Sequence, residues 1–445
     1  MYNRHSYLAL KNIPLAKVCF VLSLFISSAI TAQNPKSKTE AIQYINNQGG
    51  WALERLPKKF KKDKEVVLEA IKSYALAIQF AHESLRQNKE VVTCAVIENH
   101  KALEYADNML KKDKQFILQV VMKNGRALEY ADNSLKKDFD IVLSAVQENG
   151  FALEMADESM KKERKIVLTA VKEAGEALQF ADKELKKDKE IVLEAVKNHG
   201  YALQFADTTL LKDREIVKAA VTHDFEWGYL LKFVDEELRK DKEIVLLAVT
   251  DSGGNSLLYA EESLKNDKDI VMAAVNSYGN ALKYASDSLK KDKEVVLTAI
   301  KSDRAGQNFF QFAHESLKKD KEFVLAAVNV FGYALEFADE NLKGDREVVM
   351  EAVKSVGYAL YLSNDSLKKD KEIVMEAVKR HGCALKNAHE TLKKDKEVVL
   401  NAVKNDGRAL QFADESLKKD KDIVEAAILQ NPEAIKFADP SLRKN

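Results

Sequence analysis

The chain has few residues that hold metals or form covalent cross-links. Its 445 residues include 3 cysteines and 8 histidines, and none of them has C-x-x-C or H-x-x-x-H spacing. Asp-x-Glu pairs recur throughout, but they lack the alternating oxygens and turn glycine of a calcium loop. We therefore expect no metal and no cofactor, and we interpret the acidic pairs as helix caps.

The chain also lacks net charge, with 70 basic and 70 acidic residues. Residues 1–32 hold three basic and no acidic residues, which leaves 67 against 70 and a net charge of −3 for the remainder. Nucleic-acid binding needs a net basic stripe, whereas Lys and Glu alternate here at helical spacing. We expect no nucleic-acid partner. Paired lysines such as Lys186 and Lys187 either pair locally, which is the simpler interpretation, or form a ladder that attracts anionic polymers weakly.

One pattern, exemplified by Leu185 to Thr209, recurs along almost the whole chain. Of the fifteen intervals between successive copies, twelve are 25 residues long, and the other three are 28, 26 and 28. The apolar residue that opens each copy stands at Phe60, Leu85, Leu110, Leu135, Met160, Leu185, Leu210, Leu238, Leu264, Leu289, Leu317, Leu342, Leu367, Leu392, Leu417 and Leu442. A fixed period of this length is typical of a stacked array of repeats.

Each repeat encodes two helices. In the Leu185 copy, Asp188 is suited to cap a helix that starts directly after it. Val192, Ala195 and Val196 then fall on one face of a 3.6-residue period. Residues 202–206 predict a second, shorter helix, so each repeat is expected to be a helix-turn-helix.

Twelve of the 16 glycines share one position of the repeat, between the two helices. They are Gly50, Gly125, Gly150, Gly175, Gly200, Gly228, Gly254, Gly279, Gly332, Gly357, Gly382 and Gly407. This restriction predicts the left-handed C′ position of the first helix, where φ is positive.

These patterns predict an all-α fold, a curved α-solenoid of about fifteen stacked repeats with capping units at both ends. One repeat alone buries too little apolar surface to offset the entropy of ordering it, so neighbours must supply the cover. We expect residues 33–59 to form a polar tail and an N-terminal cap unit. Residues 60–445 form the array, and its C-terminal cap has Pro432 in place of the glycine.

Residues 1–32 predict a secretory signal peptide. Arg4, Lys11 and Lys17 precede an apolar run from Val18 to Ala32, which is shorter than the ~20 residues of a membrane-spanning helix. Cleavage would export the chain to the periplasm or the extracellular space. The alternative is an uncleaved N-terminal anchor. Cys19 lacks the small-residue context of a lipoprotein site.

Cys94 and Cys383 remain after such cleavage. They are about twelve repeats apart, and in a stack whose repeats touch only their neighbours they cannot meet. We expect both to be buried small apolar side chains in a fold without disulfides.

The full pattern is L-K-x-D-[KR]-E-[IV]-V-[LM]-x-A-V-x-x-x-G-x-A-L-x-[FY]-A-D, as at Leu342 to Asp345 with Val348, Val349, Gly357 and Ala359-Leu360. It resembles the helical repeats of domain of unknown function 4116, over about nine-tenths of the chain. The resemblance implies a helical repeat fold with no catalytic residue or cofactor. It also implies an interaction protein, because long arrays of such repeats usually serve that role.

Three repeats in the middle of the array are longer than the rest, and their extra residues form our candidate partner-binding site. The candidates are His223, Asp224, Phe225, Trp227, Tyr229, Asp303, Arg304 and Phe309. Exposed aromatic and charged residues on longer turns are typical contacts to a partner. The alternative is neutral loop insertion, with Phe310 and Phe312 in the core.

Two further sets of residues have positions in the repeat that bear on function. His82, His314 and His389 occupy the place of the aspartate that caps the connection between repeats, so we predict that they are caps. The variable position after the glycine could read an extended ligand one repeat at a time, or it could simply face solvent. It holds Phe151, Glu176, Tyr201, Tyr333, Tyr358, Cys383 and Arg408.

We therefore predict an exported, monomeric interaction scaffold that binds a protein or peptide and is not an enzyme. One alternative is a structural spacer or envelope-associated scaffold. A second is an enzyme that uses the loop from His223 to Trp227, although its residues match no known catalytic spacing.

Overall fold

The computed structural model describes residues 35–223, 229–251, 254–302 and 309–443, and every element assigned in these ranges is a helix. The predicted all-α solenoid is confirmed. By their contacts the residues divide into two arrays. The N-terminal array comprises the described residues up to Asn198 together with Phe205–Asp207, and the C-terminal array comprises His199–Gln204 and the described residues from Thr208 onward.

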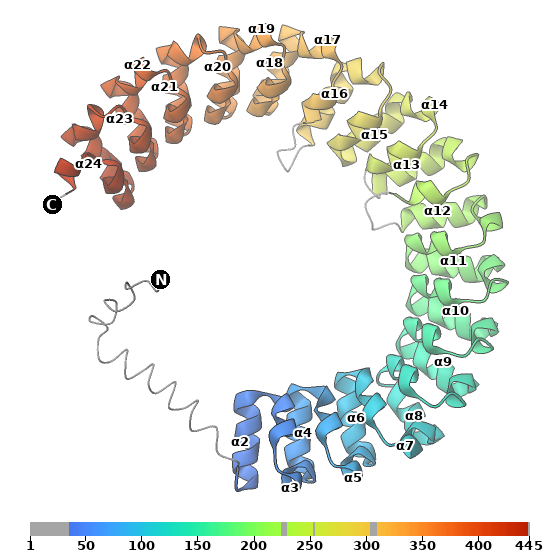
Figure 1. The fold of residues 1–445 in the computed structure, drawn as a ribbon. Coiled ribbons are helices and arrows are strands. Elements are labelled where there is room, and N and C mark those ends of the chain that lie inside the picture. Colours follow the sequence, from blue (N-terminus) through green and yellow to red (C-terminus); the bar gives the residue numbers. More distant parts are fainter. Residues whose placement is uncertain (1–34, 224–228, 252–253, 303–308, 444–445) are drawn as a thin grey trace, which may run out of the picture. The chain divides into compact units, whose positions relative to one another are not determined.

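One long α-helix dominates each repeat (Figure 1). In the N-terminal array these helices are α2 (Lys38–Gln48), α4 (Lys64–Ser73), α6 (Lys89–Glu98), α8 (Lys114–Val121), α9 (Phe139–Glu148), α10 (Arg164–Glu173) and α11 (Lys189–Asn198). In the C-terminal array they are α12 (Arg214–Thr222), α13 (Lys242–Asp251), α15 (Lys268–Ser277), α16 (Lys293–Lys301), α18 (Lys321–Val330), α20 (Arg346–Ser355), α21 (Lys371–Arg380), α23 (Lys396–Asn405) and α24 (Lys421–Gln430).

The predicted second helix is a single 3₁₀ segment. These segments are η1 (Gly50–Arg55), η2 (Ala75–Phe80), η3 (His100–Tyr105), η4 (Gly125–Tyr130), η6 (Gly150–Met155), η8 (Gly175–Phe180), η10 (Gly200–Phe205), η12 (Leu230–Phe233), η14 (Gly254–Tyr259), η15 (Gly279–Tyr284), η17 (Phe309–Phe312), η18 (Gly332–Phe337), η19 (Gly357–Leu362), η21 (Gly382–Asn387), η22 (Gly407–Phe412) and η24 (Pro432–Phe437).

A third short helix, which the sequence pattern did not reveal, connects each repeat to the next. Some of these connections are α-helical: α3 (Lys58–Lys61), α5 (Glu83–Arg86), α7 (Asn108–Lys112), α14 (Glu262–Lys265), α17 (Glu315–Lys318), α19 (Glu340–Lys343) and α22 (Glu390–Lys393). The others are 3₁₀ turns: η5 (Leu135–Lys137), η7 (Met160–Lys162), η9 (Leu185–Lys187), η11 (Thr208–Leu210), η13 (Leu238–Lys240), η16 (Leu289–Lys291), η20 (Leu367–Lys369), η23 (Leu417–Lys419) and η25 (Pro440–Leu442).

The caps and the buried face follow the sequence pattern closely. The side chain of Asp188 accepts hydrogen bonds from the amides of Glu190 (3.0 Å) and Ile191 (3.2 Å), which fixes the start of α11. Val192, Ala195 and Val196 are fully buried, as predicted, and Ile191 is also fully buried. This four-residue core recurs in the long helices, so apolar packing runs from repeat to repeat within each array.

The glycines serve close packing rather than a left-handed turn, so that prediction is wrong. Among the described glycines, the one with positive φ is Gly49 (86°), which lies outside the shared position. The residue before the glycine ends the long helix in an extended conformation, as at His381 (φ −142°, ψ 104°). A Cβ at Gly382 would lie 2.2 Å from the carbonyl oxygen of Ala402 in the next repeat. A side chain at Gly382 would therefore clash with the backbone of the neighbouring helix.

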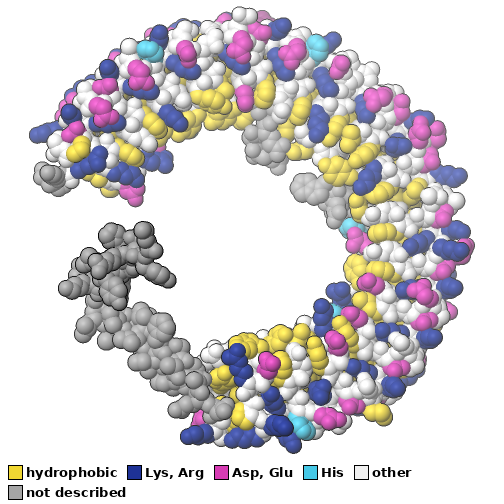
Figure 2. Space-filling view, viewed as in Figure 1, with side chains coloured by type: hydrophobic (Ala, Val, Ile, Leu, Met, Phe, Trp, Pro, Cys, Tyr) yellow, Lys and Arg dark blue, Asp and Glu magenta, His cyan; other side chains and the backbone are white. Residues whose placement is uncertain are grey.

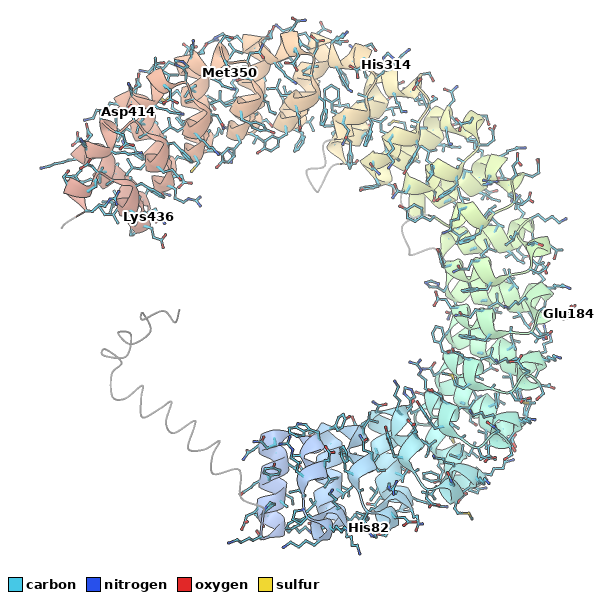
Figure 3. All side chains as sticks on the ribbon, viewed as in Figure 1. His82, Glu184, His314, Met350, Asp414 and Lys436 are labelled. Atoms are coloured by element: carbon cyan, nitrogen blue, oxygen red, sulfur yellow. The ribbon has the colours of Figure 1, made fainter. Side chains whose placement is uncertain are left out.

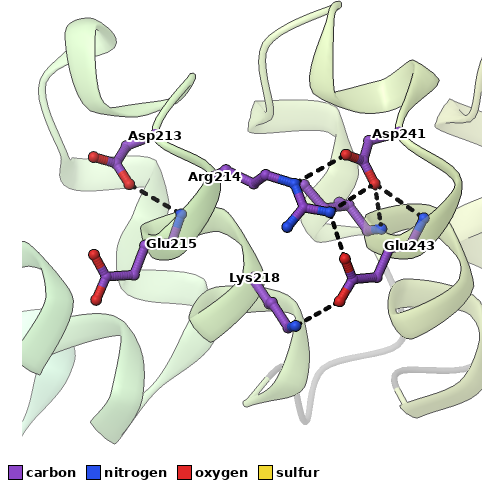
Figure 4. Close-up of polar contacts among 7 residues, drawn as sticks. Asp213, Arg214, Glu215, Lys218, Asp241 and Glu243 are labelled. Carbon is purple, nitrogen blue, oxygen red and sulfur yellow. Dashed lines mark hydrogen bonds and ion pairs between the residues drawn. The ribbon is translucent and has the colours of Figure 1, made fainter.

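Successive repeats are joined by a backbone hydrogen bond and by ion pairs. The amide of Asp132 donates to the carbonyl of Lys111 (3.0 Å), and the equivalent bond joins Asp339 to Lys318 (2.9 Å). A basic residue at the start of one long helix then pairs with the capping aspartate of the next, as Lys114 does with Asp138 (2.6 Å). Figure 4 shows this arrangement between α12 and α13.

Each array has two edges with different contents. We call the edge where the long helices end and the glycines lie the turn edge, and the opposite edge, where the short third helices lie, the connection edge (Figure 1). At the connection edge, Nδ1 of His82 accepts from the amide of Ser84 (3.2 Å), and His314 and His389 make the equivalent bonds. Figure 3 labels His82 and His314 at this edge. The predicted capping role of these histidines is confirmed.

Candidate partner-binding site

The turn edge carries exposed apolar side chains. In the N-terminal array these are Trp51, Tyr74, Ile97 and Met122, one from each of four successive repeats. Figure 2 shows hydrophobic side chains gathered along the turn edge over α4 and α6, and again over α18 to α21. The residues before and after the glycine lie here because the helix ends and the chain reverses at that point.

Aromatic contacts follow the turn edge of the C-terminal array. The rings of Tyr278 and Phe309 meet edge to face at 5.6 Å, and those of Phe331 and Tyr333 do so at the same distance. Further along, the ring of Tyr358 lies 4.8 Å from that of His381 in the next repeat. Contacts of this kind hold the rings in fixed positions, as an interaction site requires.

An open pocket of about 380 Å³ lies beside Tyr358 and His381. Asp406 and Arg408 from the following repeat, and Asn431 from the last one, contribute polar groups to its lining. The pocket therefore combines an aromatic wall with charged and amide groups that come from successive repeats.

Asp406 organises the polar side of this pocket. It accepts two charge-assisted hydrogen bonds from Arg408, from Nε (3.0 Å) and Nη2 (2.8 Å), and one from Sγ of Cys383 (3.3 Å). The bonds from Arg408 lower the pKa of Asp406 to about 2. Burial, together with the carboxylate of Asp406, raises the pKa of Cys383 to about 11. The thiol is thus a hydrogen-bond donor here and a poor nucleophile.

Three of the eight predicted contact residues lie in the described part of the chain. Nδ1 of His223 lies 2.9 Å from the carbonyl of Ala219 in its own helix, and Tyr229 is 38% exposed and packs edge to face on Tyr259. Phe309 is 2% exposed, so the expectation of a surface contact is wrong for this residue. Asp224, Phe225, Trp227, Asp303 and Arg304 lie outside the described residues.

The position before the glycine is a part of this surface that the sequence analysis missed. It holds Tyr278, Phe331, His381 and Asp406, and the last three contact residues at the position after the glycine. Its variability among otherwise similar repeats was the available signal. The sequence pattern gives this position no role beyond the last turn of the long helix, because the helical period continues to it.

The cysteines differ from expectation in one respect. Both are free, but Cys94 is exposed and Cys383 is half-buried, so neither is the buried side chain that we predicted. Cys94 stands at the helix position of Glu194, which faces outward between repeats rather than into the core. Within the described ranges, no group of histidine, cysteine and carboxylate side chains is placed to hold a metal ion, and no helix has the length and apolar character to cross a membrane.

One family model matches almost the whole described chain, and it is described as a domain of unknown function, DUF4116. It matches residues 39–86, 63–111, 113–161, 163–212, 213–265, 251–290, 267–305, 292–343, 345–393 and 395–443. Most of these segments cover two of the 25-residue repeats, so the family model spans a pair of them. No curated protein matches the chain.

Proposed function

This chain belongs to the DUF4116 family of tandem helical repeats, and we propose that it is an exported scaffold that binds a protein or peptide along the turn edge. The observation that carries the proposal is the set of exposed apolar side chains at the turn edge of the N-terminal array, together with the partly exposed aromatic pairs at the turn edge of the C-terminal array. Exposed apolar patches on a stacked array are typical of interaction surfaces.

We place the strongest contact of this scaffold at the pocket beside Tyr358. An aromatic wall favours an apolar side chain of the partner, and Arg408 and Asp406 would fix the orientation of its polar groups. Because successive repeats each contribute one element of the site, an extended segment fits it better than a compact ligand. Binding of this kind needs no catalytic step.

The test is affinity capture from the extracytoplasmic fraction of the host, followed by binding measurements with the purified partner. Tyr358→Ala and Arg408→Ala are expected to weaken binding by about tenfold or more, the usual effect of losing a hot-spot side chain. Tyr361→Ala is the matched control, because this tyrosine of the same 3₁₀ helix is 47% exposed but does not line the pocket. Equal loss in all three variants would contradict the proposed site.

A structural spacer is the second candidate, and the uniform ion pairs between repeats favour it. In a spacer the number of repeats matters more than any side chain. Such a protein would capture no partner, and Tyr358→Ala would leave its biological role intact, whereas insertion or deletion of whole repeats would alter it.

A further inference from the structure

The first groove on the connection edge of the N-terminal array is unusually basic. It lies between α3 and α5, has a volume of about 720 Å³, and includes Phe80 and Ala81 in its lining. Its cationic residues are Lys58, Lys59, Lys61, Lys62 and Arg86, against Glu83 as the one carboxylate among the described lining residues. Basic side chains and one histidine cluster at this edge in Figure 2, and Figure 3 labels the histidine as His82.

The next two grooves along the same edge are smaller and better balanced. The second, of about 310 Å³, combines Arg86 and Lys111 with the carboxylates of Glu83, Glu104 and Asp107. The third, of about 290 Å³, pairs Lys111 and Lys112 with Asp132. The excess of basic residues in the first groove is therefore specific to that groove and is not shared by these two neighbouring grooves.

Replacement of one aspartate explains part of this difference. In repeats that keep the aspartate, the second lysine of the preceding repeat can lie near it, as Lys112 does near Asp132 (4.0 Å) and Lys394 near Asp414 (3.7 Å). Lys62 is the equivalent lysine in the first groove, and the capping position opposite it is His82. His82 caps α5 through Nδ1 but brings no carboxylate.

The cations of this groove are not neutralised by ion pairs. Lys59 and Lys61 donate to the backbone carbonyls of Lys36 (2.9 Å) and Glu54 (2.7 Å), which neutralises neither charge. Among the described residues, Lys58 and Lys62 form no ion pair, and Nε of Arg86 is buried without a hydrogen-bond partner, as is Nε of Arg239 at the same position of its repeat.

We propose that this groove binds a small, multiply charged oxyanion such as a polyphosphate or a phosphorylated metabolite. Five cations around one cavity attract such an anion, and the ammonium and guanidinium groups supply charge-assisted hydrogen bonds to its oxygens. Phe80 and Ala81 give the cavity an apolar wall that accommodates a nonpolar part of the ligand. The site lies at the edge opposite the proposed peptide surface and does not depend on it.

The test is calorimetric titration of the purified chain with inorganic tripolyphosphate. Saturable binding at one site is expected, and its affinity should fall as salt is added, because Lys58, Lys59 and Lys62 are exposed. His82→Asp restores the aspartate of the repeat pattern beside Lys62 and should weaken binding about tenfold, while capping of α5 is retained. Asp132→His makes the opposite change in the third groove and should leave the affinity unchanged.

Two further measurements separate the proposal from its competitors. Lys58→Gln and Lys62→Gln should each weaken tripolyphosphate binding without changing the thermal midpoint. The second measurement is binding to vesicles of mixed phosphatidylcholine and phosphatidylglycerol. Binding to vesicles without saturable tripolyphosphate binding would overturn the proposal in favour of a membrane surface, and equal affinity of the His82→Asp variant would overturn it outright.

Discussion

Nε of Arg214 in α12 donates to Oδ2 of Asp241 at 3.1 Å, and Asp241 is the residue whose side chain caps α13 (Figure 4). The same guanidinium contacts Glu243, which also accepts from Lys218 at 2.5 Å. One side chain thus joins two successive repeats at the point where the second long helix begins. Equivalent pairs join Lys268 to Asp292 and Arg346 to Asp370.

Removal of the Arg214 side chain should weaken this junction in a salt-dependent way. Arg214→Ala should lower the thermal midpoint of the chain by about 1–2 °C at low salt and by less in 1 M salt, because the pair is half exposed. Circular dichroism at the two salt concentrations measures the change. Arg380→Ala is the control, since Arg380 pairs within its own helix with Glu376. The same loss in high salt would show that packing, not charge, is responsible.

The capping aspartates should make the array sensitive to acid. Burial alone would raise the pKa of Asp241, but hydrogen bonds from Arg214 and from backbone amides outweigh it and hold the pKa below its usual value. Asp292 and Asp370 behave in the same way. A lowered pKa in the folded state stabilises the fold above the unfolded pKa of about 3.9, and this contribution is lost as the pH falls through the folded values.

We therefore expect the thermal midpoint to be constant from pH 7 to about pH 5 and to fall steeply below about pH 4. Asp241→Asn should lower the midpoint at pH 7 and flatten this acid limb, since it removes one of the contributing groups. A variant with an unchanged acid limb would mean that other carboxylates dominate.

Gly382→Ala should destabilise the C-terminal array by about 1–3 kcal/mol, because the new Cβ would meet the backbone of the next repeat 2.2 Å away. Gly344→Ala is the matched control. There the nearest atom is the side-chain nitrogen of Asn364, which is exposed and can move. Urea denaturation of both variants gives the comparison, and equal stability would show that the helices can separate at no cost.

Glu163 is the weak cap of the N-terminal array. It stands at the capping position of α10 but makes no side-chain cap hydrogen bond, unlike Asp138 at the start of α9. Glu163→Asp should stabilise the first turn of α10 by about 1 kcal/mol. Hydrogen exchange at the amides of Lys165 and Ile166 measures the local effect. Glu163→Gln should produce no slowing, since it lacks the shorter side chain that reaches those amides.

The two free cysteines should react at very different rates. At pH 8, a pKa of about 11 leaves roughly one Cys383 thiol in a thousand ionised, whereas Cys94 is exposed. Iodoacetamide should therefore label Cys94 first, as followed by peptide mass spectrometry. Asp406→Asn should speed the labelling of Cys383, because it removes the negative charge that holds the proton on sulfur. Labelling of Cys383 at an unchanged rate in this variant would assign its protection to burial alone.

Most of the fold is readable from the sequence because its determinants are local. Asp188 caps the helix that follows it, and Val192 and Val196 face one side of that helix wherever its neighbours lie. Repetition then supplies the neighbours, since each copy must bury its apolar face against the next. The all-α class, the period and the capping histidines all follow from such short-range patterns.

The candidate site was less predictable, because it depends on contacts between repeats. The inserted residues led to the prediction that Phe309 contacts a partner, but its ring is buried and packs against Tyr278. The pocket instead combines Tyr358 with Asp406, which are 48 residues apart in the sequence and lie at different positions of the repeat. No pattern within a single copy relates two such positions.

The sequence by itself determined the helical repeat, its caps and its buried face, because these depend on residues within one or two helical turns. Only the tertiary structure decided why glycine recurs and which side chains share a surface. Glycine at one fixed position of the repeat is compatible either with a positive φ or with close packing against a neighbouring backbone. The carbonyl oxygen of Ala402 next to Gly382 shows that close packing is the reason. That oxygen comes from the next repeat, and its distance is fixed by how closely the long helices pack.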